Sequence, residues 1–421
     1  MTIETLPYSD FSHAIVAGAT PLHVPLNGTI EITHRCPLTC AHCYNNLPMN
    51  DANARRGEMS FEEHCRVVDE LAELGMLWLL YTGGEIFARA DFLEIYRHAR
   101  RAGLLVTLFT NATMITERIA DALAAEPPFA IEVTLYGVTK KTYELLTGIP
   151  GSYDRCIRGI ELMIERKLPL SLKTVAVTIN RHEMKQMFEL TDRLGVEFKF
   201  DPMITPRIDC SASPLAVRMS PADIVAMDLE FPERVAEWRR LASMGGPQPQ
   251  EGVTPTVYDC GGGVNSFAID PEGNMTICVL SHVELVDVRN GRVREGWEKF
   301  LRGVRARPVR GIMKCTYCAL QSLCGSCPAS AELEAGDPEK PVDFLCRTAH
   351  LRASVFGVAV QPHGDCEYCE GGVHRDWVEN QTNDVFAHAG REIEAVMAMP
   401  LPEHVAASGC ASGGCNGCSV K

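Results

Sequence analysis

The sequence predicts an α/β fold: an open, partial (β/α)6 barrel, then a small cysteine-rich domain and a cysteine-containing tail. Three observations predict it. Strand-like and helix-like stretches alternate between residues 28 and 207, and a Gly/Pro/Gln-rich break follows at 245–252. Fifteen of the eighteen cysteines fall into spaced groups, most of them after that break. Strands that alternate with helices pair in parallel through right-handed crossovers, which makes the first region a parallel α/β domain.

Six stretches rich in Val, Ile, Leu, Phe or Thr and bounded by Gly, Pro or polar turns are expected to form strands. They are Thr29–Thr33, Leu77–Tyr81, Leu104–Phe109, Ala130–Leu135, Leu170–Thr178 and Glu197–Asp201. Six strands are too few for the closed eight-stranded barrel, so a partial barrel is expected. The chemistry of such folds lies at the carboxyl ends of the strands, and the residues that follow them are the first candidates for a site.

Helical patterns lie between these strands. The first opens with Ser60 and Glu63 at the spacing of a capping box, and it ends at Gly75. A later helix opens at Ser220, with Pro221 at its first position. The other expected helices are Asp91–Ala102, Thr116–Ala124, Tyr153–Arg166, His182–Leu194 and Asn383–Met397.

These elements divide the chain into five expected parts. They are an N-terminal extension (1–27), the partial barrel (28–207), a linker with a helix (208–257), a cysteine-rich domain (258–358) and a cysteine-containing tail (359–421).

The composition of the 421 residues narrows the class of protein. A hydrophobic share of 46% excludes general disorder. Membrane association is not expected, since no apolar run reaches the roughly 20 residues that a bilayer span needs. The N-terminus lacks the basic and apolar segments of a secretory signal, so a cytoplasmic location is expected. The net charge of −14 disfavours nucleic acid as a partner.

Eighteen cysteines in a reducing compartment indicate metal or redox chemistry rather than disulfides. Cys36, Cys40 and Cys43 follow the first strand with the spacing CxxxCxxC. A [4Fe–4S] cluster normally takes four thiolates, so three leave one iron open to a small molecule. The alternative is structural zinc, with His42 or His34 as the fourth ligand.

This spacing, with Thr82-Gly83-Gly84-Glu85 at the end of the second strand, resembles the radical S-adenosylmethionine (SAM) superfamily over about residues 28–207. The resemblance implies that Cys36, Cys40 and Cys43 are the catalytic residues and hold the cluster. It also implies that SAM binds the open iron and is cleaved to a 5′-deoxyadenosyl radical, chemistry that belongs to the cofactor. The glycines would let the backbone approach SAM, and the Glu85 carboxylate would receive its amino group.

Further SAM contacts are implied by position at other strand ends, where ordinary packing is the alternative. With the glycine motif they complete the expected cofactor-binding set: His42, Gly83, Gly84, Glu85, Asn111, Thr134, Lys173, Asn180 and Arg207.

Seven later cysteines resemble the SPASM domain of radical SAM peptide and protein maturases. By that resemblance, one auxiliary [4Fe–4S] cluster would be held by Cys315, Cys318, Cys324 and Cys346. Another would be held by Cys260, Cys278 and Cys327, with no fourth cysteine nearby. Two zinc ribbons are the alternative. The tail cysteines would bind a further metal, serve as mobile thiols or have no essential role: Cys366, Cys369, Cys410, Cys415 and Cys418.

The resemblance implies a hydrogen-abstracting enzyme that acts on a ribosomally made peptide or protein, by crosslinking, epimerisation or oxidation. A flavodoxin- or ferredoxin-type electron donor is expected, and so is a separate leader-recognition protein, because 27 residues precede the barrel. The alternatives are cofactor biosynthesis (tetrapyrrole or quinone-cofactor side-chain chemistry), sulfatase-type maturation, and a non-catalytic multi-cluster electron carrier. The Gly83-Gly84-Glu85 motif disfavours the carrier, which has no need of a SAM site.

Overall fold

The computed structural model describes residues 7–247 and 251–389. These residues form two compact units. The barrel unit comprises residues 18–218 and 262–305, and the helical unit comprises the described parts of 1–17, 219–261 and 306–421. The N-terminal helix α1 (Tyr8–Ala19) ends where the barrel unit begins.

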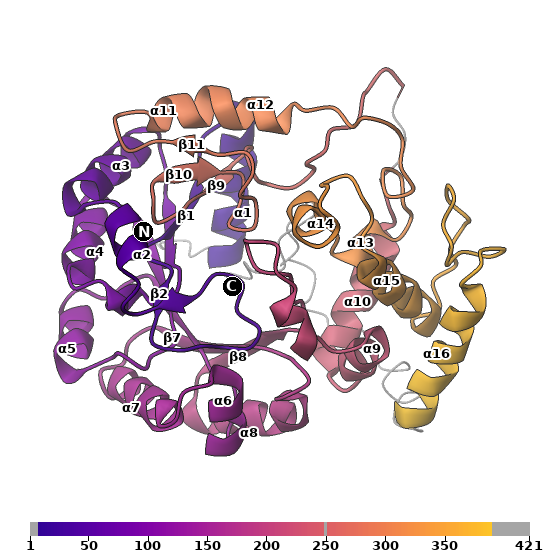
Figure 1. Cartoon of the computed structure of the whole chain (residues 1–421), viewed down its shortest axis with the longest axis horizontal. Coiled ribbons are helices and arrows are strands. Elements are labelled where there is room, and N and C mark those ends of the chain that lie inside the picture. Colours follow the sequence, from indigo (N-terminus) through magenta and orange to yellow (C-terminus); the bar gives the residue numbers. More distant parts are fainter. Residues whose placement is uncertain (1–6, 248–250, 390–421) are drawn as a thin grey trace, which may run out of the picture. The chain divides into compact units, whose positions relative to one another are not determined.

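A nine-stranded sheet is the centre of the barrel unit, in the order β11-β10-β9-β1-β4-β5-β6-β7-β8. Each strand from β1 to β8 in this order pairs in parallel with the next, and Figure 1 shows helices around the outside of these strands. The expected partial α/β barrel is confirmed. The six parallel strands are β1 (Asn27–Glu31), β4 (Trp78–Thr82), β5 (Leu105–Thr110), β6 (Ala130–Thr134), β7 (Leu170–Val175) and β8 (Glu197–Asp201).

Three strands from a later part of the chain extend this sheet. β9 (Ser266–Ile269) pairs in parallel with β1, and β10 (Asn274–Thr276) and β11 (Val286–Asp287) continue antiparallel beyond it. From the sequence, this segment is expected to belong to the cysteine-rich domain (258–358). In the structure it completes the barrel unit, with the helical stretch formed by α11 (Val293–Glu295), one π-helical turn (Gly296–Leu301) and α12 (Arg302–Arg305).

The central barrel strands β4, β5 and β6 alternate strictly between buried and partly exposed residues. In β5, Val106, Leu108 and Thr110 are buried while the residues between them are partly exposed. Successive side chains of a strand point to opposite faces, so one face packs beneath the helices and the other lines the barrel. The covering helices are α2 (Ala52–Gly57), α3 (Phe61–Glu73), α4 (Phe92–Arg101), α5 (Glu117–Ala125), α6 (Lys140–Thr147), α7 (Ser152–Glu165) and α8 (Met184–Leu194).

Side-chain caps define several helix starts. The expected capping box of α3 is confirmed: Ser60 Oγ accepts from the Glu63 amide at 3.1 Å, and Glu63 accepts from the Ser60 amide at 2.8 Å. Thr139 caps α6, a helix that the sequence analysis missed. With eight residues, α6 is too short for a clear helical periodicity, and most of its stability comes from packing.

The helical unit is built around its own apolar core, to which Val225, Trp238, Leu323 and Leu351 contribute. Its helices are α9 (Pro221–Leu229), α10 (Pro232–Met244), α13 (Gln321–Cys324), α14 (Pro328–Ala335), α15 (Asp343–Val355) and α16 (Arg375–Ala389). The helix expected from Asn383 begins eight residues earlier, at Arg375, and its expected end lies outside the described residues.

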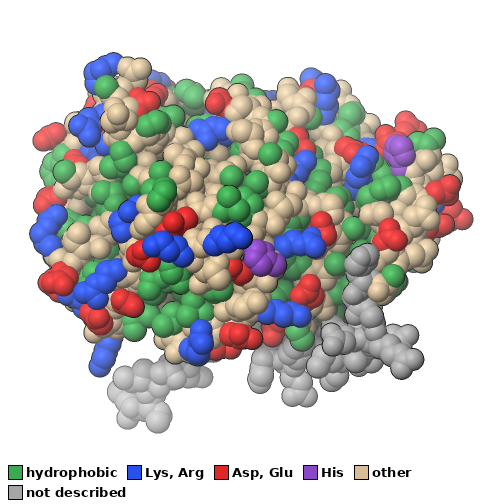
Figure 2. Space-filling view, turned by 60° about the horizontal axis from the view of Figure 1, so that its bottom comes forward, with side chains coloured by type: hydrophobic (Ala, Val, Ile, Leu, Met, Phe, Trp, Pro, Cys, Tyr) green, Lys and Arg blue, Asp and Glu red, His purple; other side chains and the backbone are tan. Residues whose placement is uncertain are grey.

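The structure also bears on the expected membrane and charge properties of the chain. No helix within 7–247 or 251–389 is long and apolar enough to cross a bilayer. Basic and acidic side chains are interspersed on the face drawn in Figure 2. Two basic residues of the helical unit have acidic partners there: Arg310 pairs with Asp337 and Glu339, and Lys314 pairs with Glu367.

Candidate active site

The three-cysteine loop lies directly after β1. Cys36 ends the short strand β2 (Arg35–Cys36), which pairs in parallel with β3 (Leu47–Pro48), so the loop that carries Cys40 and Cys43 is closed at its base. The amides of Thr39 and Ala41 donate to carbonyl groups at the end of α6, at 2.9 and 3.0 Å. The helix missed from the sequence thus anchors the cysteine loop.

The surroundings of the three thiols suit a metal centre. Burial raises the pKa of the Cys36, Cys40 and Cys43 thiols, and the Cys43 and Cys36 charges raise that of Cys40 further. Three thiolates close together in a largely desolvated loop are unfavourable without a cation, whereas a coordinating metal deprotonates thiols outright. The donor set therefore fits an iron–sulfur cluster held by Cys36, Cys40 and Cys43.

Glu31, at the end of β1, organises the far side of the loop. One carboxylate oxygen accepts from the Tyr44 hydroxyl at 2.8 Å and from the Asn45 amide at 2.6 Å. The other oxygen lies 3.3 Å from Nε2 of His34. His34 is therefore directed at Glu31, and Glu31 acts as a support for the loop that the sequence analysis did not identify.

The glycine motif at the end of β4 runs against the strand that leads into Cys36. A Cβ at Gly83 would lie 2.2 Å from the Thr33 carbonyl oxygen, and one at Gly84 would lie 2.5 Å from the Arg35 carbonyl oxygen. Gly83 also has a φ of +128°, which glycine adopts without strain. The Glu85 amide then donates to the Arg35 carbonyl at 3.0 Å. The two glycines bring Glu85 beside the cysteine loop.

Glu85 is buried, with 1% of its surface exposed. Its carboxylate accepts from the Thr110 hydroxyl at 2.8 Å and from the Asn111 amide at 2.9 Å, so it joins the ends of β4 and β5. Burial raises the pKa of Glu85 to about 7, although these hydrogen bonds oppose the shift. A buried carboxylate of this kind suits a cationic partner such as an ammonium group.

Asn111 connects this carboxylate to the thiols. Its side-chain amide nitrogen donates to Cys36 Sγ at 3.5 Å, while its oxygen accepts from the Thr113 amide at 3.0 Å. The structure therefore brings together Cys36, Cys40, Cys43, Glu85 and Asn111 from the ends of three neighbouring strands.

Tyr136 and His42 pack beside the same loop. The Tyr136 hydroxyl is hydrogen-bonded to the Cys40 thiol. The His42 ring meets the Tyr136 ring edge-on at 5.0 Å, and burial lowers the pKa of His42 to about 4, which keeps it neutral. Among the described residues, the buried Nδ1 of His42 has no hydrogen-bond partner.

Two other predicted contacts are used within the protein. Arg207 donates to the Cys43 carbonyl at 3.2 Å and to the Asn46 carbonyl at 2.8 Å, so it braces the backbone of the cysteine loop. Asn180 is fully buried, accepts from the Val177 amide at 2.8 Å and donates to the Tyr136 carbonyl at 3.2 Å. Both side chains support the loop and its neighbours.

The remaining predicted contacts lie on the barrel lining. Thr134 and Lys173 are opposite one another in the pairing of β6 with β7. Lys173 Nζ lies 3.1 Å from the Glu132 carboxylate, which also accepts from Lys199 at 2.8 Å. Lys173 is therefore engaged by Glu132, a lining residue that the sequence analysis did not single out.

A second set of thiols meets in the helical unit. The Cys315 thiol is hydrogen-bonded to Cys346, which lowers the pKa of Cys315, and the nearby Cys324 and Cys318 oppose that shift. These are the four cysteines expected to share one auxiliary cluster. Of the other three, Cys278 lies in the barrel unit, while Cys260 and Cys327 lie in the helical unit.

A third group of possible metal ligands was predicted only in part, because the sequence indicated its two cysteines but not its two histidines. Cys366 and Cys369 lie beside His350 and His363, and the ligand atoms of all four lie within 4.8 Å of one another. The signal that could have identified His363 is its spacing, since it precedes Cys366 by three residues, as Cys366 precedes Cys369. His350 is distant along the chain. Cys410, Cys415 and Cys418 lie outside the described residues.

Comparison with known proteins places this geometry in a family. A family model described as the Radical SAM superfamily matches residues 30–191. An AdoMet-dependent heme synthase of Methanosarcina barkeri is 29% identical over 331 residues, which cover 73% of this chain and 92% of the relative. A PqqA peptide cyclase of Rhodopseudomonas palustris is 28% identical over 360 residues, which cover 80% of this chain and 90% of the relative.

Solved structures share the fold. Streptococcus suis SuiB bound to precursor peptide SuiA matches with a TM-score of 0.60 and 17% identity, over 82% of this chain and 83% of that one. Native anSMEcpe with bound AdoMet matches with a TM-score of 0.58 and 15% identity, over 86% and 100%. The match of the family model over β1 to α8, which includes the cysteine loop and the Glu85 motif, leads to one conclusion. Residues 30–191 belong to the radical SAM superfamily, and the protein is a radical SAM enzyme.

Proposed function

We propose that this enzyme modifies a ribosomally made peptide or protein by hydrogen abstraction. The observation that carries the proposal is the convergence of the buried Cys36 thiol, the half-buried Cys40 and Cys43 thiols and the buried Glu85 carboxylate at the ends of β1, β4 and β5. When bound there, the [4Fe–4S] cluster and SAM would supply a 5′-deoxyadenosyl radical.

The chain's own residues have separate tasks at this site. Cys36, Cys40 and Cys43 hold the cluster, and the Asn111 amide donates to Cys36 Sγ at 3.5 Å. Hydrogen bonds to ligating sulfurs are among the features that tune a cluster's potential. Glu85 would receive the SAM amino group. The Asn111 backbone amide donates to the Glu85 carboxylate at 2.9 Å and fixes the position of that carboxylate. The orienting groups are therefore in place before SAM binds.

The remaining predicted SAM contacts stay part of the proposal as residues that surround these groups. Gly83 and Gly84 keep the backbone beside the cysteine loop, and His42 and Arg207 pack against that loop. Of the other three, Thr134 ends β6, Lys173 lies within β7 and Asn180 follows β7.

We further propose one or two auxiliary [4Fe–4S] clusters. The meeting of Cys315, Cys318, Cys324 and Cys346 supports the first. A second would use Cys260, Cys278 and Cys327, as the resemblance implies. An auxiliary cluster that relays electrons would accept them from a flavodoxin- or ferredoxin-type donor. An auxiliary cluster that anchors a substrate heteroatom would bind a peptide that a separate leader-recognition protein presents.

The choice of peptide as substrate rests on the relatives. The PqqA peptide cyclase alignment covers 80% of this chain, against 73% for the heme synthase alignment. A second candidate is oxidative side-chain chemistry on a tetrapyrrole, because the heme synthase alignment takes in 92% of that relative.

The radical chemistry is tested with anaerobically reconstituted protein, SAM and dithionite. Wild type should release 5′-deoxyadenosine, and each of Cys36→Ala, Cys40→Ala and Cys43→Ala should abolish it. Cys65→Ala is the matched control, because Cys65 is a partly exposed thiol on α3, remote from the loop in sequence. A wild type that is loaded with iron yet forms no 5′-deoxyadenosine would refute the proposed chemistry.

The substrate is tested separately. Peptides encoded beside the gene and, separately, a tetrapyrrole are incubated with the active enzyme and analysed by mass spectrometry. A defined mass change in a peptide supports maturation. A change in the tetrapyrrole alone replaces it with the second candidate.

A further inference from the structure

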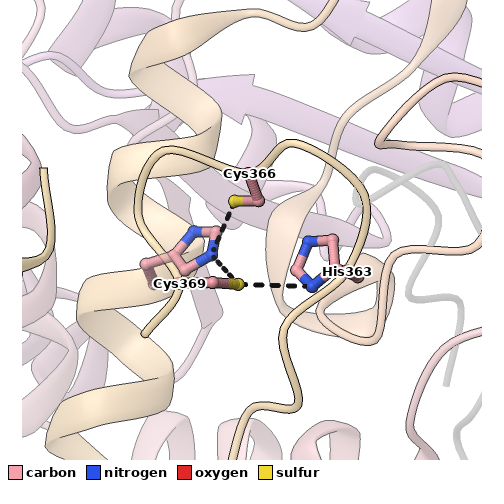
Figure 3. Close-up of side chains that lie close together, drawn as sticks. His363, Cys366 and Cys369 are labelled. Carbon is pink, nitrogen blue, oxygen red and sulfur yellow. Dashed lines mark hydrogen bonds between the residues drawn. The ribbon is translucent and has the colours of Figure 1, made fainter. Parts of the chain in front are cut away.

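The helical unit contains a second kind of metal-ligand set, distinct from its group of four thiols. His350 lies on α15, and His363, Cys366 and Cys369 lie in the segment between α15 and α16. Their ligand atoms lie within 4.8 Å of one another, and Figure 3 shows His363 and the two thiols turned toward one space. Four donors from two segments thus converge on one point.

The separations match a single tetrahedral ion. His350 Nε2 lies 3.3 Å from Cys366 Sγ and 3.6 Å from Cys369 Sγ, and His363 Nδ1 lies 3.4 Å from Cys369 Sγ. Ligands at the usual Zn–S and Zn–N distances, about 2.3 and 2.0 Å, are about 3.6 Å apart across a tetrahedral edge. The side chains need only small shifts to reach that geometry.

The tautomer of His350 leaves its Nε2 free to bind a metal. Its Nδ1 lies 2.8 Å from the Cys346 carbonyl oxygen, so Nδ1 carries the proton and Nε2 presents a lone pair to the two thiols. A ligating histidine typically donates its other ring N–H to a backbone carbonyl in this way. The helical position of His350, four residues after Cys346, supplies this second contact.

His363 offers its Nδ1 to the same point. That atom also lies 3.2 Å from the Gln361 carbonyl, a contact that metal binding would replace. Its Nε2 lies 3.1 Å from Cys318 Sγ. A metal on Nδ1 leaves the proton on Nε2, where it can donate to the Cys318 sulfur.

Three of the four proposed ligands are buried, and His363 is half-buried. The exposed fractions of His350, Cys366 and Cys369 are 4%, 7% and 3%. Two buried thiolates balance the charge of one divalent cation, and the two neutral imidazoles complete the set. Buried thiols and imidazoles with so few other polar partners are expensive unless a metal or hydrogen bonds satisfy them.

We propose that His350, His363, Cys366 and Cys369 bind one Zn²⁺ ion and that this ion fastens the 363–369 segment to α15. Two nitrogens and two sulfurs in a tetrahedron are typical of zinc. A [4Fe–4S] cluster normally requires four thiolates. A [2Fe–2S] centre with two histidines divides its ligands between two irons, whereas these four converge on one point.

The experiment measures zinc and iron per chain in full-length protein purified without oxygen. Wild type should hold about one zinc that survives dialysis, and zinc K-edge absorption should show two sulfur and two nitrogen neighbours. Cys366→Ala/Cys369→Ala should lose the zinc and keep its iron. Cys36→Ala should lose iron and keep the zinc, which separates this site from the proposed catalytic function.

Two further variants protect the test against misfolding and against the tail. His363→Ala should lose zinc, whereas His363→Cys restores a fourth ligand and should retain it. Replacement of Cys410, Cys415 and Cys418 by Ala should leave the zinc in place. Zinc that persists in Cys366→Ala/Cys369→Ala, or that disappears with the tail cysteines, would overturn the assignment, and so would loss of iron in place of zinc.

Discussion

Single residues at the active site act on two neighbours at once. Asn111 uses its backbone amide for Glu85 and its side chain for Cys36. Tyr136 binds the Cys40 thiol through its hydroxyl, while its carbonyl accepts from Asn180. Because Cys36, Glu85, Asn111 and Asn180 are buried, loss of one hydrogen-bonding group leaves a buried neighbour unsatisfied, and effects of substitution should exceed those of a single hydrogen bond.

Glu85 gives the folded chain a pH dependence. Burial raises its pKa from 4.5 to about 7. Since the folded-state pKa exceeds the unfolded one, this contribution to stability is complete below about pH 4.5 and is lost as the pH rises through about 7. Between pH 5 and 8 the cluster-free wild type should lose up to about 3 kcal/mol relative to Glu85→Gln.

Urea unfolding of both proteins at the two pH values measures this difference. Glu73→Gln, a change at an exposed carboxylate at the end of α3, should follow the wild type. Parallel pH profiles for wild type and Glu85→Gln would contradict the assignment.

At the scale of elements, one ionic network joins three helices of the helical unit. Asp228 of α9 is fully buried and accepts from Arg234 of α10 at 2.7 Å and from Arg352 of α15 at 3.0 Å. Arg352 also stacks on Trp238, 3.6 Å from the ring centre. The same helix α15 carries Cys346 and His350. The network therefore fixes the position of α15, the helix that carries ligands of both proposed metal sites of this unit.

Asp228→Asn should destabilise the helical unit by about 3–5 kcal/mol, the usual cost of leaving a buried charge such as Arg352 without its partner. Zinc should then dissociate faster on addition of a chelator, because α15 is held less firmly. Denaturation and zinc-release rates are the measurements. Glu233→Gln, at an exposed position of α10, is the control and should leave both unchanged. If Asp228→Asn had the stability and the zinc-release rate of the wild type, the network would not be what holds α15 in position.

The limits of sequence reasoning are clearest for elements and residues that depend on distant partners. The barrel strands were predictable because alternation and flanking turns are local signals. The addition of β9 to β1 joins residues more than two hundred positions apart, and His350 meets Cys366 only through the packing of α15. Spacing shows ligands that are neighbours in sequence, such as Cys36 and Cys40. It cannot show those that a tertiary contact brings together.

Over the whole molecule, each compact unit has its own apolar core and its own group of thiols. Cys36, Cys40 and Cys43 lie in the barrel unit, while Cys315, Cys318, Cys324 and Cys346 lie in the helical unit. The described structure gives neither group a ligand from the other group. Loss of the cluster held by one of these two groups should therefore leave the cluster of the other group in place.

Cys315→Ala/Cys318→Ala tests this independence. The double variant should lose about four iron atoms per chain, the content of one [4Fe–4S] cluster. It should still release 5′-deoxyadenosine from SAM, because Cys36, Cys40, Cys43 and Glu85 are unchanged, while modification of the substrate should stop. Iron analysis and product chromatography on one preparation measure both. Cys65→Ala/Cys210→Ala, which removes two thiols outside the spaced groups, is the matched control and should keep its iron. If the double variant lost SAM cleavage together with its iron, the two centres would depend on each other. In that case the helical unit would be needed for the first radical step as well as for the substrate.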